Sequence, residues 1–291
     1  MLDAILPPDP TAVADLVRRA LAEDRAWHDV TTRALVPADQ QGHGAFLVKA
    51  DGVVCGMDVV AAVFAAMSPA IELDVLAADG SSVDAGHIAA EVRGPLAPLL
   101  SGERVALNFL QHLSGIATLT RRFVDRAAEG GPAQIVDTRK TTPGLRDLER
   151  YAVRVGGARN HRDTLEDGVL IKDNHIAAAL KRGVSVEQLV RQARMSVPHT
   201  LRIELEVTDV ATALLAVAAG VDVILLDNMT PKQLRTVVET LGGDGRVLEA
   251  SGGVSLDNVR EVAATGVHLI SVGRITHSAP ALDISLEISA Q

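Results

Sequence analysis

The sequence predicts a mixed α/β protein with two domains, an antiparallel α+β domain followed by a domain of repeated βα units. The chain has 291 residues, more than one compact domain usually needs. Short strand-like runs separated by Asp-Gly and Ala-Gly turns occupy residues 41–93. After Pro132 strand-like runs alternate with helical patterns, which is typical of a parallel sheet.

The first part opens with a helical pattern over residues 11–24, which places Val13, Val17 and Leu21 on one apolar face. Residues 57–67 (MDVVAAVFAAM) predict a buried helix between the strand-like runs. A long helical pattern follows over residues 99–127. We expect it to break near Ser114-Gly115, since glycine weakens a helix interior.

The second part contains six clear strand-like runs and one weaker candidate near residues 156–160. The six are residues 134–138, 169–173, 202–207, 222–228, 246–251 and 268–273. This number predicts closure like that of a barrel, in which functional groups gather at the C-terminal ends of the strands. The alternating pattern of residues 280–289 is expected to return to the sheet of the first domain.

Composition excludes several classes of protein. The formal net charge of −9 argues against general nucleic-acid binding. The single Cys55 excludes an internal disulfide and a cysteine-built metal site. The N-terminal residues lack the basic and apolar regions of a signal peptide, and no apolar run is long enough to span a bilayer. We therefore expect a cytoplasmic protein.

Basic side chains follow two of the strand-like runs. Arg139 and Arg162 have planar groups that match carboxylates, whereas Lys140 and Lys172 are compact charges suited to phosphate oxygens. Lys172 is the most informative, because a lysine inside an apolar parallel strand is costly without a partner. These residues predict an anion site.

The alternative is a set of surface arginines paired with nearby acids. We prefer that alternative for Arg146, Arg150 and Arg154, which lie on a predicted helix. Among the histidines, His161 between Asn160 and Arg162 is the best site candidate, while His112 and His43 are expected to be structural or on the surface.

Acidic residues and glycines end the later strands. Glu206 and Asp227 predict a polar site that either holds Mg²⁺ through water or accepts ribose hydroxyls. Ser251-Gly252-Gly253 precedes a helical pattern and predicts a phosphate-binding turn, although an ordinary βα turn would look the same. Gly273-Arg274 at the next strand end strengthens the phosphate hypothesis.

With these motifs assembled, the chain resembles the quinolinate phosphoribosyltransferase family, also called the nicotinate-nucleotide pyrophosphorylases. The resemblance covers nearly the whole length. Its most specific motifs are SGERVALNFLQHLSGIAT (101–118), DTRKTTPGLR (137–146), NHRDTLEDGVLIKDNHI (160–176), ELEV (204–207), LLDN (225–228), EASGG (249–253) and SVGRITHS (271–278).

The resemblance implies an N-terminal α/β sandwich (residues 1–108, joined by residues 276–291) and an incomplete seven-stranded α/β barrel (residues 109–275). It also implies decarboxylating transfer of a phosphoribosyl group to quinolinate, with Mg²⁺ as cofactor. A homodimer is implied as well, in which Arg104 of one subunit reaches the quinolinate of the other.

The resemblance further implies the role of each site residue. The quinolinate pocket would be lined by Arg139, His161, Arg162 and Lys172, and Thr138 would be a further substrate-binding residue. Phosphoribosyl pyrophosphate and its Mg²⁺ would be served by Lys140, Glu206 and Asp227. The 5′-phosphate would be held by Ser251, Gly252, Gly253, Val272, Gly273 and Arg274.

Three residues depart from the pattern of the family, namely His28, Thr164 and Arg274, of which Arg274 adds a cation beside the expected phosphate site. Two alternatives stay open. One is the molybdenum-transport-associated relative, which would take another acceptor. The other is a phosphosugar-binding barrel, either a binding module or an aldolase with Lys172 as Schiff-base lysine.

Overall fold

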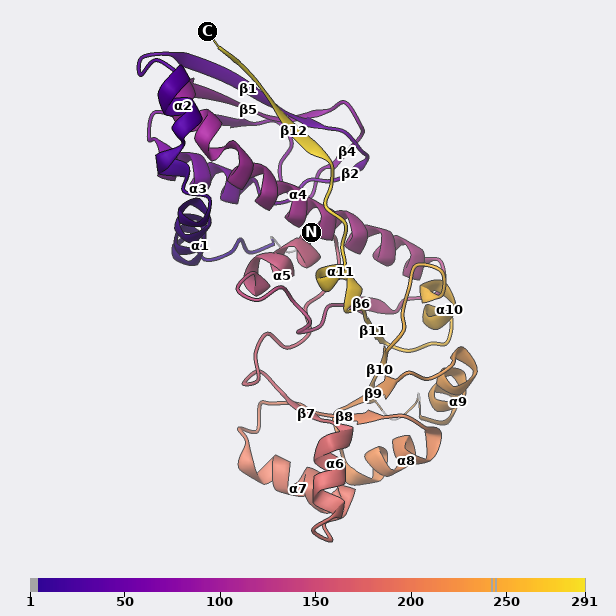
Figure 1. Cartoon of the computed structure of the whole chain (residues 1–291). Coiled ribbons are helices and arrows are strands. Elements are labelled where there is room, and N and C mark those ends of the chain that lie inside the picture. Colours follow the sequence, from indigo (N-terminus) through magenta and orange to yellow (C-terminus); the bar gives the residue numbers. More distant parts are fainter. Residues whose placement is uncertain (1–4, 242, 244, 291) are drawn as a thin grey trace. The chain divides into compact units, whose positions relative to one another are not determined.

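The computed structural model describes residues 5–241, 243 and 245–290, and these residues form two compact units (Figure 1). Of the described residues, the first unit contains 5–121, 142–157 and 275–290, and the second contains 122–141, 158–241, 243 and 245–274. The expected division between residues 108 and 109 falls inside helix α4 (Leu96–Ala128), which runs without interruption. Because that helix is continuous, its first turns and its middle stay with the first unit.

An antiparallel sheet organises the first unit. The strand order is β12-β1-β5-β3, formed by β12 (Ile284–Ala290), β1 (Gln41–Val48), β5 (Ile88–Pro95) and β3 (Glu72–Val75). Every pairing is antiparallel, and Phe46 of β1 lies opposite Leu286 of β12. The C-terminal segment therefore completes the sheet that the N-terminal strands begin.

The first unit also contains helices, and one of them packs on this sheet through an aromatic pair. The helices are α1 (Pro10–Glu23), α2 (Val30–Leu35), α3 (Met57–Met67), α4, α5 (Arg146–Val155) and α11 (Arg274–His277), with a short 3₁₀ turn at Ala26–His28 and a two-strand ladder of β2 (Gly52–Val53) and β4 (Ser82–Val83). Phe46 and Phe64 of α3 meet edge to face with ring centres 6.3 Å apart. This contact fixes α3 against the sheet, and residues 57–67 form the buried helix that their sequence predicts.

Two expectations for the first unit were wrong. Helix α4 does not break at Ser114-Gly115, because this pair is used for close packing. A Cβ on Gly115 would lie 2.1 Å from the Pro280 carbonyl oxygen, and Ser114 exchanges hydrogen bonds with the backbone of Cys55. Arg150 is not a surface residue either, since only 2% of it is exposed.

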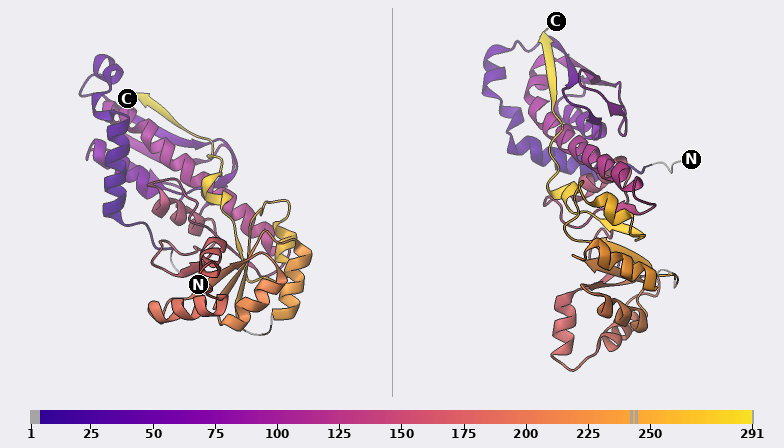
Figure 2. Two further views of the ribbon diagram at one scale, coloured as in Figure 1. Left: turned by 60° about the horizontal axis from the view of Figure 1, so that its bottom comes forward. Right: turned by 90° about the vertical axis from the view of Figure 1, so that its right-hand side faces the viewer.

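A parallel sheet forms the second unit. Its strand order is β6-β11-β10-β9-β8-β7, formed by β6 (Gln134–Val136), β11 (Leu269–Ser271), β10 (Val247–Ser251), β9 (Val223–Asp227), β8 (Ile203–Val207) and β7 (Val169–Ile171). Adjacent strands are all parallel. The helices are α6 (Asp173–Leu180), α7 (Val186–Ser196), α8 (Val210–Ala219), α9 (Pro231–Leu241) and α10 (Val259–Ala263), and Figure 2 (left) shows them on the outside of the strands.

The weaker strand candidate near residues 156–160 is present only as a single parallel bridge between Val136 and Arg159. The six clear runs all form strands, and the fold class is confirmed as a small-sheet domain plus a parallel α/β domain of the incomplete barrel kind. Within the described residues, no helix combines the length and the apolar character needed to cross a membrane.

Candidate active site

A cavity of about 550 Å³ opens at the C-terminal ends of the parallel strands. Every strand of this sheet contributes to it, through its last residues or through the residues that follow. The structure brings together eleven of the predicted site residues here: Thr138, Arg139, Lys140, His161, Arg162, Lys172, Glu206, Asp227, Ser251, Gly252 and Gly253. We call this space the C-terminal cavity.

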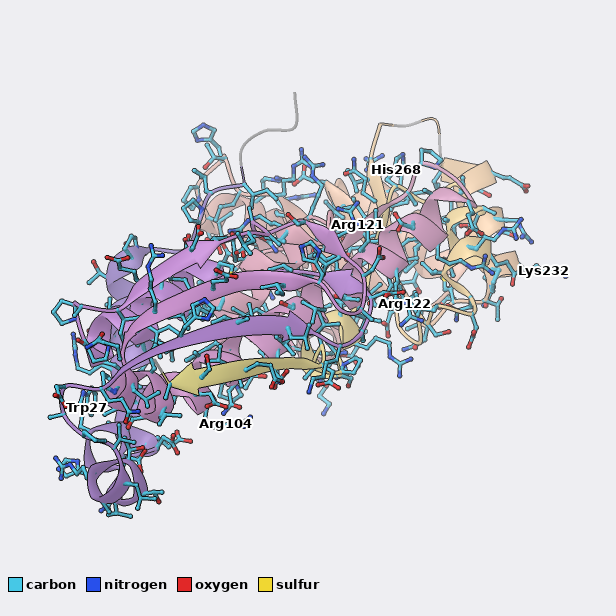
Figure 3. The ribbon with its side chains drawn as sticks, turned by 90° about the horizontal axis from the view of Figure 1, so that it is seen from above. Trp27, Arg104, Arg121, Arg122, Lys232 and His268 are labelled. Carbon is cyan, nitrogen blue, oxygen red and sulfur yellow. The ribbon has the colours of Figure 1, made fainter. Side chains whose placement is uncertain are left out.

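Four predicted residues do not line the C-terminal cavity. Arg104 lies exposed on α4 of the first unit (Figure 3). Val272, Gly273 and Arg274 follow β11, but the backbone N–H of Val272 donates to the Val136 carbonyl at 2.9 Å. That N–H is therefore engaged within the sheet and does not point to a bound phosphate.

The guanidinium groups of Arg139 and Arg162 both line the C-terminal cavity, where their positive charges repel each other. Arg162 donates from Nη1 to the Gly168 carbonyl at 2.8 Å. Burial lowers the pKa of Arg162 below its usual range, and the nearby charge of Arg139 lowers it further. The Nε of Arg139 is buried and has no hydrogen-bond partner in the structure. A planar anion would satisfy this donor and relieve the repulsion.

Lys172 is placed differently from the expectation. It is not inside an apolar strand, because β7 ends at Ile171 and Lys172 is the residue that precedes α6. Its backbone N–H donates to Nδ1 of His175 at 2.9 Å, which caps the start of α6. The side chain of Lys172 is exposed, and so is that of Lys140. Both ammonium groups are accessible at the mouth of the cavity.

The acids Glu206 and Asp227 stand at the ends of the neighbouring strands β8 and β9. Burial raises the pKa of Glu206, and the negative charge of Asp227 raises it further, while Lys172 lowers it. Two carboxylates that repel each other at the edge of a cavity are a setting that a cation relieves. The residues present therefore fit a hydrated Mg²⁺.

Two glycines in the left-handed region form the turn after β10. Gly252 has φ +88° and Gly253 has φ +62°. The adjoining Asn228 also has a positive φ, and its backbone N–H donates to the Ser251 carbonyl at 2.8 Å. The expected helix does not begin directly after this turn, because α10 starts only at Val259. Any phosphate here would depend on the turn and not on a helix N-terminus.

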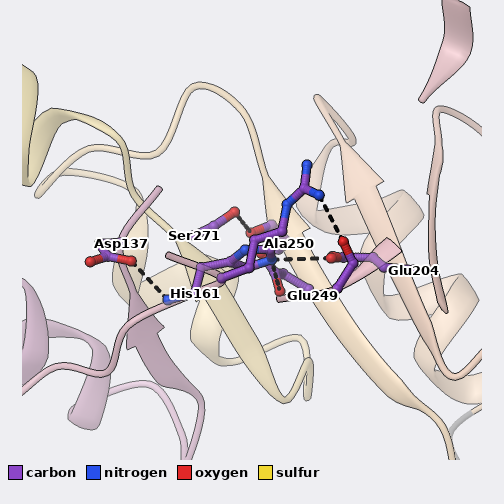
Figure 4. A network of polar contacts seen from close by, with 8 residues as sticks. Asp137, His161, Glu204, Glu249, Ala250 and Ser271 are labelled. Carbon is purple, nitrogen blue, oxygen red and sulfur yellow. Dashed lines mark hydrogen bonds and ion pairs between the residues drawn. The ribbon is translucent and has the colours of Figure 1, made fainter. Parts of the chain in front are cut away.

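A network of buried polar contacts lies beside the C-terminal cavity and contributes His161 and Glu249 to its lining (Figure 4). The Nε2 atom of His161 lies 3.1 Å from Oε2 of Glu204 and 3.6 Å from Oε2 of Glu249. The backbone N–H of His161 donates to Oδ1 of the buried Asp137 at 2.8 Å, which fixes the position of the histidine. We call Glu204, Glu249 and His161 the buried acid–histidine cluster.

The electrostatics of this cluster favour bound protons. Burial by itself lowers the pKa of His161, but the hydrogen bond to Glu204 and the charges of Glu249, Glu204 and Asp137 raise it above its ordinary value. Burial raises the pKa of Glu249 to about 7, and the charge of Glu204 contributes in the same direction. Glu249 therefore exchanges protons near neutral pH, and the surrounding charges favour the protonated form of His161.

Sequence reasoning named no role for Glu204, Glu249 or Asn228. A usable signal existed for the acids, because Glu204 and Glu206 share one face of a strand and Glu249 interrupts an apolar run. How deeply the side chains of Glu204 and Glu249 are buried depends on how the sheet curves around them. The sequence pattern alone does not contain that information.

Comparison with known proteins identifies the relatives of this chain. Residues 29–114 match the family model described as quinolinate phosphoribosyl transferase, N-terminal domain, and residues 116–287 match the model described as the C-terminal domain of the same family. A probable nicotinate-nucleotide pyrophosphorylase [carboxylating] of Synechocystis is 42% identical over 92% of this chain and 90% of its own length. The Bacillus subtilis protein of the same name is 39% identical over 94% of this chain and 92% of its own length.

Solved structures give the same result. NadC from Streptococcus pyogenes superposes with a TM-score of 0.92 at 37% identity and covers 98% of this chain and 99% of that one. The nicotinate-nucleotide pyrophosphorylase from Francisella tularensis superposes with a TM-score of 0.92 at 34% identity, with coverage of 99% and 100%.

Proposed function

This chain belongs to the quinolinate phosphoribosyltransferase family, and we propose that it converts quinolinate and phosphoribosyl pyrophosphate into nicotinate mononucleotide, pyrophosphate and CO₂. The observation that supports this most directly is the pair of guanidinium groups, Arg139 and Arg162, in a cavity that also contains two acids. One pocket thereby offers a dicarboxylate site beside a site for a charged sugar. An enzyme that joins a pyridine dicarboxylate to a phosphorylated sugar needs both sites.

The acceptor would bind on the cationic side of the C-terminal cavity. The buried Nε of Arg139 is a donor without a partner, and Arg162 is held by Gly168 in a fixed orientation. Lys172 and His161 add positive charge around the same space. These cationic side chains would neutralise both carboxylates of quinolinate and leave its ring nitrogen free to attack the sugar.

The donor would bind on the acidic side. Lys140 would stabilise the leaving pyrophosphate, and Glu206 and Asp227 would stabilise positive charge that develops on the ribose carbon. Mg²⁺ would neutralise the pyrophosphate and be held by its oxygens and by water, with no direct protein ligand assigned. The turn at Gly252 and Gly253 would accept the 5′-phosphate on backbone N–H groups.

Catalysis in this arrangement depends on positioning and electrostatics, because no covalent nucleophile is required. An assay of quinolinate-dependent release of pyrophosphate and CO₂ tests the function. Equal amounts of both products are expected with quinolinate, and no product with nicotinate. Turnover of nicotinate in place of quinolinate would favour a relative with another acceptor, and borohydride trapping at Lys172 would favour an aldolase.

We also propose that the working enzyme is a homodimer in which Arg104 of one subunit completes the quinolinate site of the other. Arg104 is exposed on α4, so its guanidinium is available to a second chain. Mixing inactive Arg104→Ala and Lys140→Ala proteins tests this. Shared sites predict partial recovery of activity, since a mixed dimer contains one site with both residues intact. No recovery after subunit exchange would contradict it.

A further inference from the structure

A second cavity lies on the opposite side of the buried acid–histidine cluster. It has a volume of about 770 Å³, and the first residues of several strands line it, among them Gln134, Val223 and Val247. It therefore opens at the N-terminal ends of the parallel strands, and we call it the N-terminal cavity. Three residues line both cavities: His161, Arg162 and Glu249. These three polar side chains therefore lie between the two spaces.

This layer differs from the interior expected of a barrel, which branched apolar side chains usually fill. Glu249 is 1% exposed and Glu204 is 6% exposed, and each has an Oε1 atom that is buried without a hydrogen-bond partner. An unpartnered buried carboxyl oxygen costs stability, so packing does not explain why two acids stand here. The hydrogen bond between His161 and Glu204 indicates that the cluster shares protons.

The decarboxylation step needs a proton. When the carbon–carbon bond to the departing carboxylate breaks, the electron pair stays on the ring carbon beside the ribosylated nitrogen. That carbon must gain a proton before the CO₂ recombines with it. Solvent in the C-terminal cavity is displaced by two substrates, so the proton has to reach the ring through the protein.

We propose that Glu249 and His161 form a proton relay from the N-terminal cavity to the ring carbon of the acceptor. The inference rests on the function proposed above. The imidazolium of His161 gives its Nε2 proton to the carbanion and becomes neutral. The carboxyl group of Glu249 then returns a proton to Nε2, 3.6 Å from its Oε2 atom, and regains one from water in the N-terminal cavity. One solvent proton is consumed for each CO₂ released.

The charges around Glu249 suit this cycle. Glu204 of β8 and Asp137 after β6 are negative, and His161 is positive. The hydroxyl of Ser271 in β11 donates to the carbonyl of Ala250, the residue after Glu249, at 3.3 Å. Arg162 lies beside Glu204 and lines both cavities. With its pKa near 7, Glu249 is able both to lose and to regain a proton at neutral pH.

The test separates the two chemical steps in the Glu249→Gln variant. Glutamine keeps the shape of the side chain but does not transfer a proton. We expect pyrophosphate release within about threefold of the original rate and CO₂ release slowed on the order of 10²-fold, as for loss of a general acid. Quinolinate mononucleotide should accumulate in rapid-quench samples. The pH dependence of CO₂ release near pH 7 should be lost.

The Glu149→Gln variant is the matched control, because Glu149 is fully buried and also pairs with a histidine, His112, at 2.9 Å. In that variant CO₂ and pyrophosphate should be released at equal rates. Equal slowing of both products in Glu249→Gln would show that Glu249 only supports the fold, and would overturn the relay. Absence of quinolinate-dependent pyrophosphate release in the unaltered enzyme would instead overturn the proposed function.

Discussion

Asn228 and Gly252 are packed so closely that a Cβ atom on Gly252 would lie 2.3 Å from Oδ1 of Asn228. The two residues join the ends of β9 and β10, since Asn228 donates from its backbone to Ser251 and from Nδ2 to Asp227. The same contact therefore shapes the glycine turn and orients one of the two site acids.

Replacing Gly252 by alanine is expected to displace Asn228 and to raise the KM for phosphoribosyl pyrophosphate at least about tenfold, a loss of roughly 1.4 kcal/mol in binding. Gly183→Ala is the matched control, because Gly183 has φ +73° with nothing within 4 Å of an added Cβ. Gly183→Ala should lose about 1 kcal/mol of stability from backbone strain, and Gly252→Ala should lose at least that much because its Cβ also displaces Asn228. Only Gly252→Ala should lose substrate affinity, and equal KM values in the two would contradict the role of the turn.

Lys140→Ala is expected to fold normally and to lose on the order of 10²–10³ in kcat, the usual effect of removing one electrostatic contact from a transition state. The exposure of Lys140 means that its removal leaves no cavity. Circular dichroism and steady-state kinetics measure the two properties. Lys181→Ala, an exposed lysine after α6, should behave like the original protein. Turnover near the original rate in Lys140→Ala would exclude Lys140 from the site.

Arg139→Lys tests whether the planar group matters or only its charge. Lysine keeps the positive charge but loses the paired N–H donors, including the buried Nε. We expect the KM for quinolinate to rise roughly 10-fold to 100-fold, with little change in the KM for phosphoribosyl pyrophosphate. Arg191→Lys on the exposed side of α7 serves as control. An unchanged quinolinate KM would place the dicarboxylate elsewhere.

The pKa of Glu249 predicts how stability depends on pH. Its pKa rises from an ordinary 4.5 to about 7 in the folded protein, because burial disfavours the charged form. This contribution to stability is fully present below pH 4.5 and is lost as the pH rises through 7. Glu249→Gln stays neutral at every pH. Its Tm relative to the unaltered protein should therefore be several degrees higher at pH 8.5 than at pH 5, and a constant Tm difference would contradict the shift.

Arg274→Ala addresses the cation that departs from the family pattern. Arg274 is exposed at the start of α11 and does not line the C-terminal cavity. If Arg274 strengthens phosphate binding, as the sequence suggests, its removal should raise the KM for phosphoribosyl pyrophosphate about threefold, as for an exposed charge pair. An unchanged KM would show that this arginine has no part in binding the donor.

The sequence predicted where the parallel strands end, and it predicted that the side chains at those ends would lie close together. Most of the basic and acidic residues predicted at the strand ends reached the same cavity, because parallel strands end at one edge, whereas Arg274 did not. The link from His161 to Glu204 and Glu249 was not predictable, since it depends on how deeply the sheet encloses each side chain. The helix break predicted at Gly115 was wrong for a related reason. The lack of a side chain at Gly115 serves a contact with Pro280, far away in the sequence.

The pairing of β12 with β1 bears on how the protein is made. Phe46 and Leu286 are neighbours in the sheet, although the whole parallel unit lies between them in the sequence. During synthesis one edge of β1 stays without its partner until the final strand has left the ribosome. The parallel unit is complete in sequence before that moment, so it is able to fold first. A chain truncated after Arg274 would contain every strand of the parallel sheet together with an open strand edge on β1, and that edge is where it would first bind chaperones or aggregate.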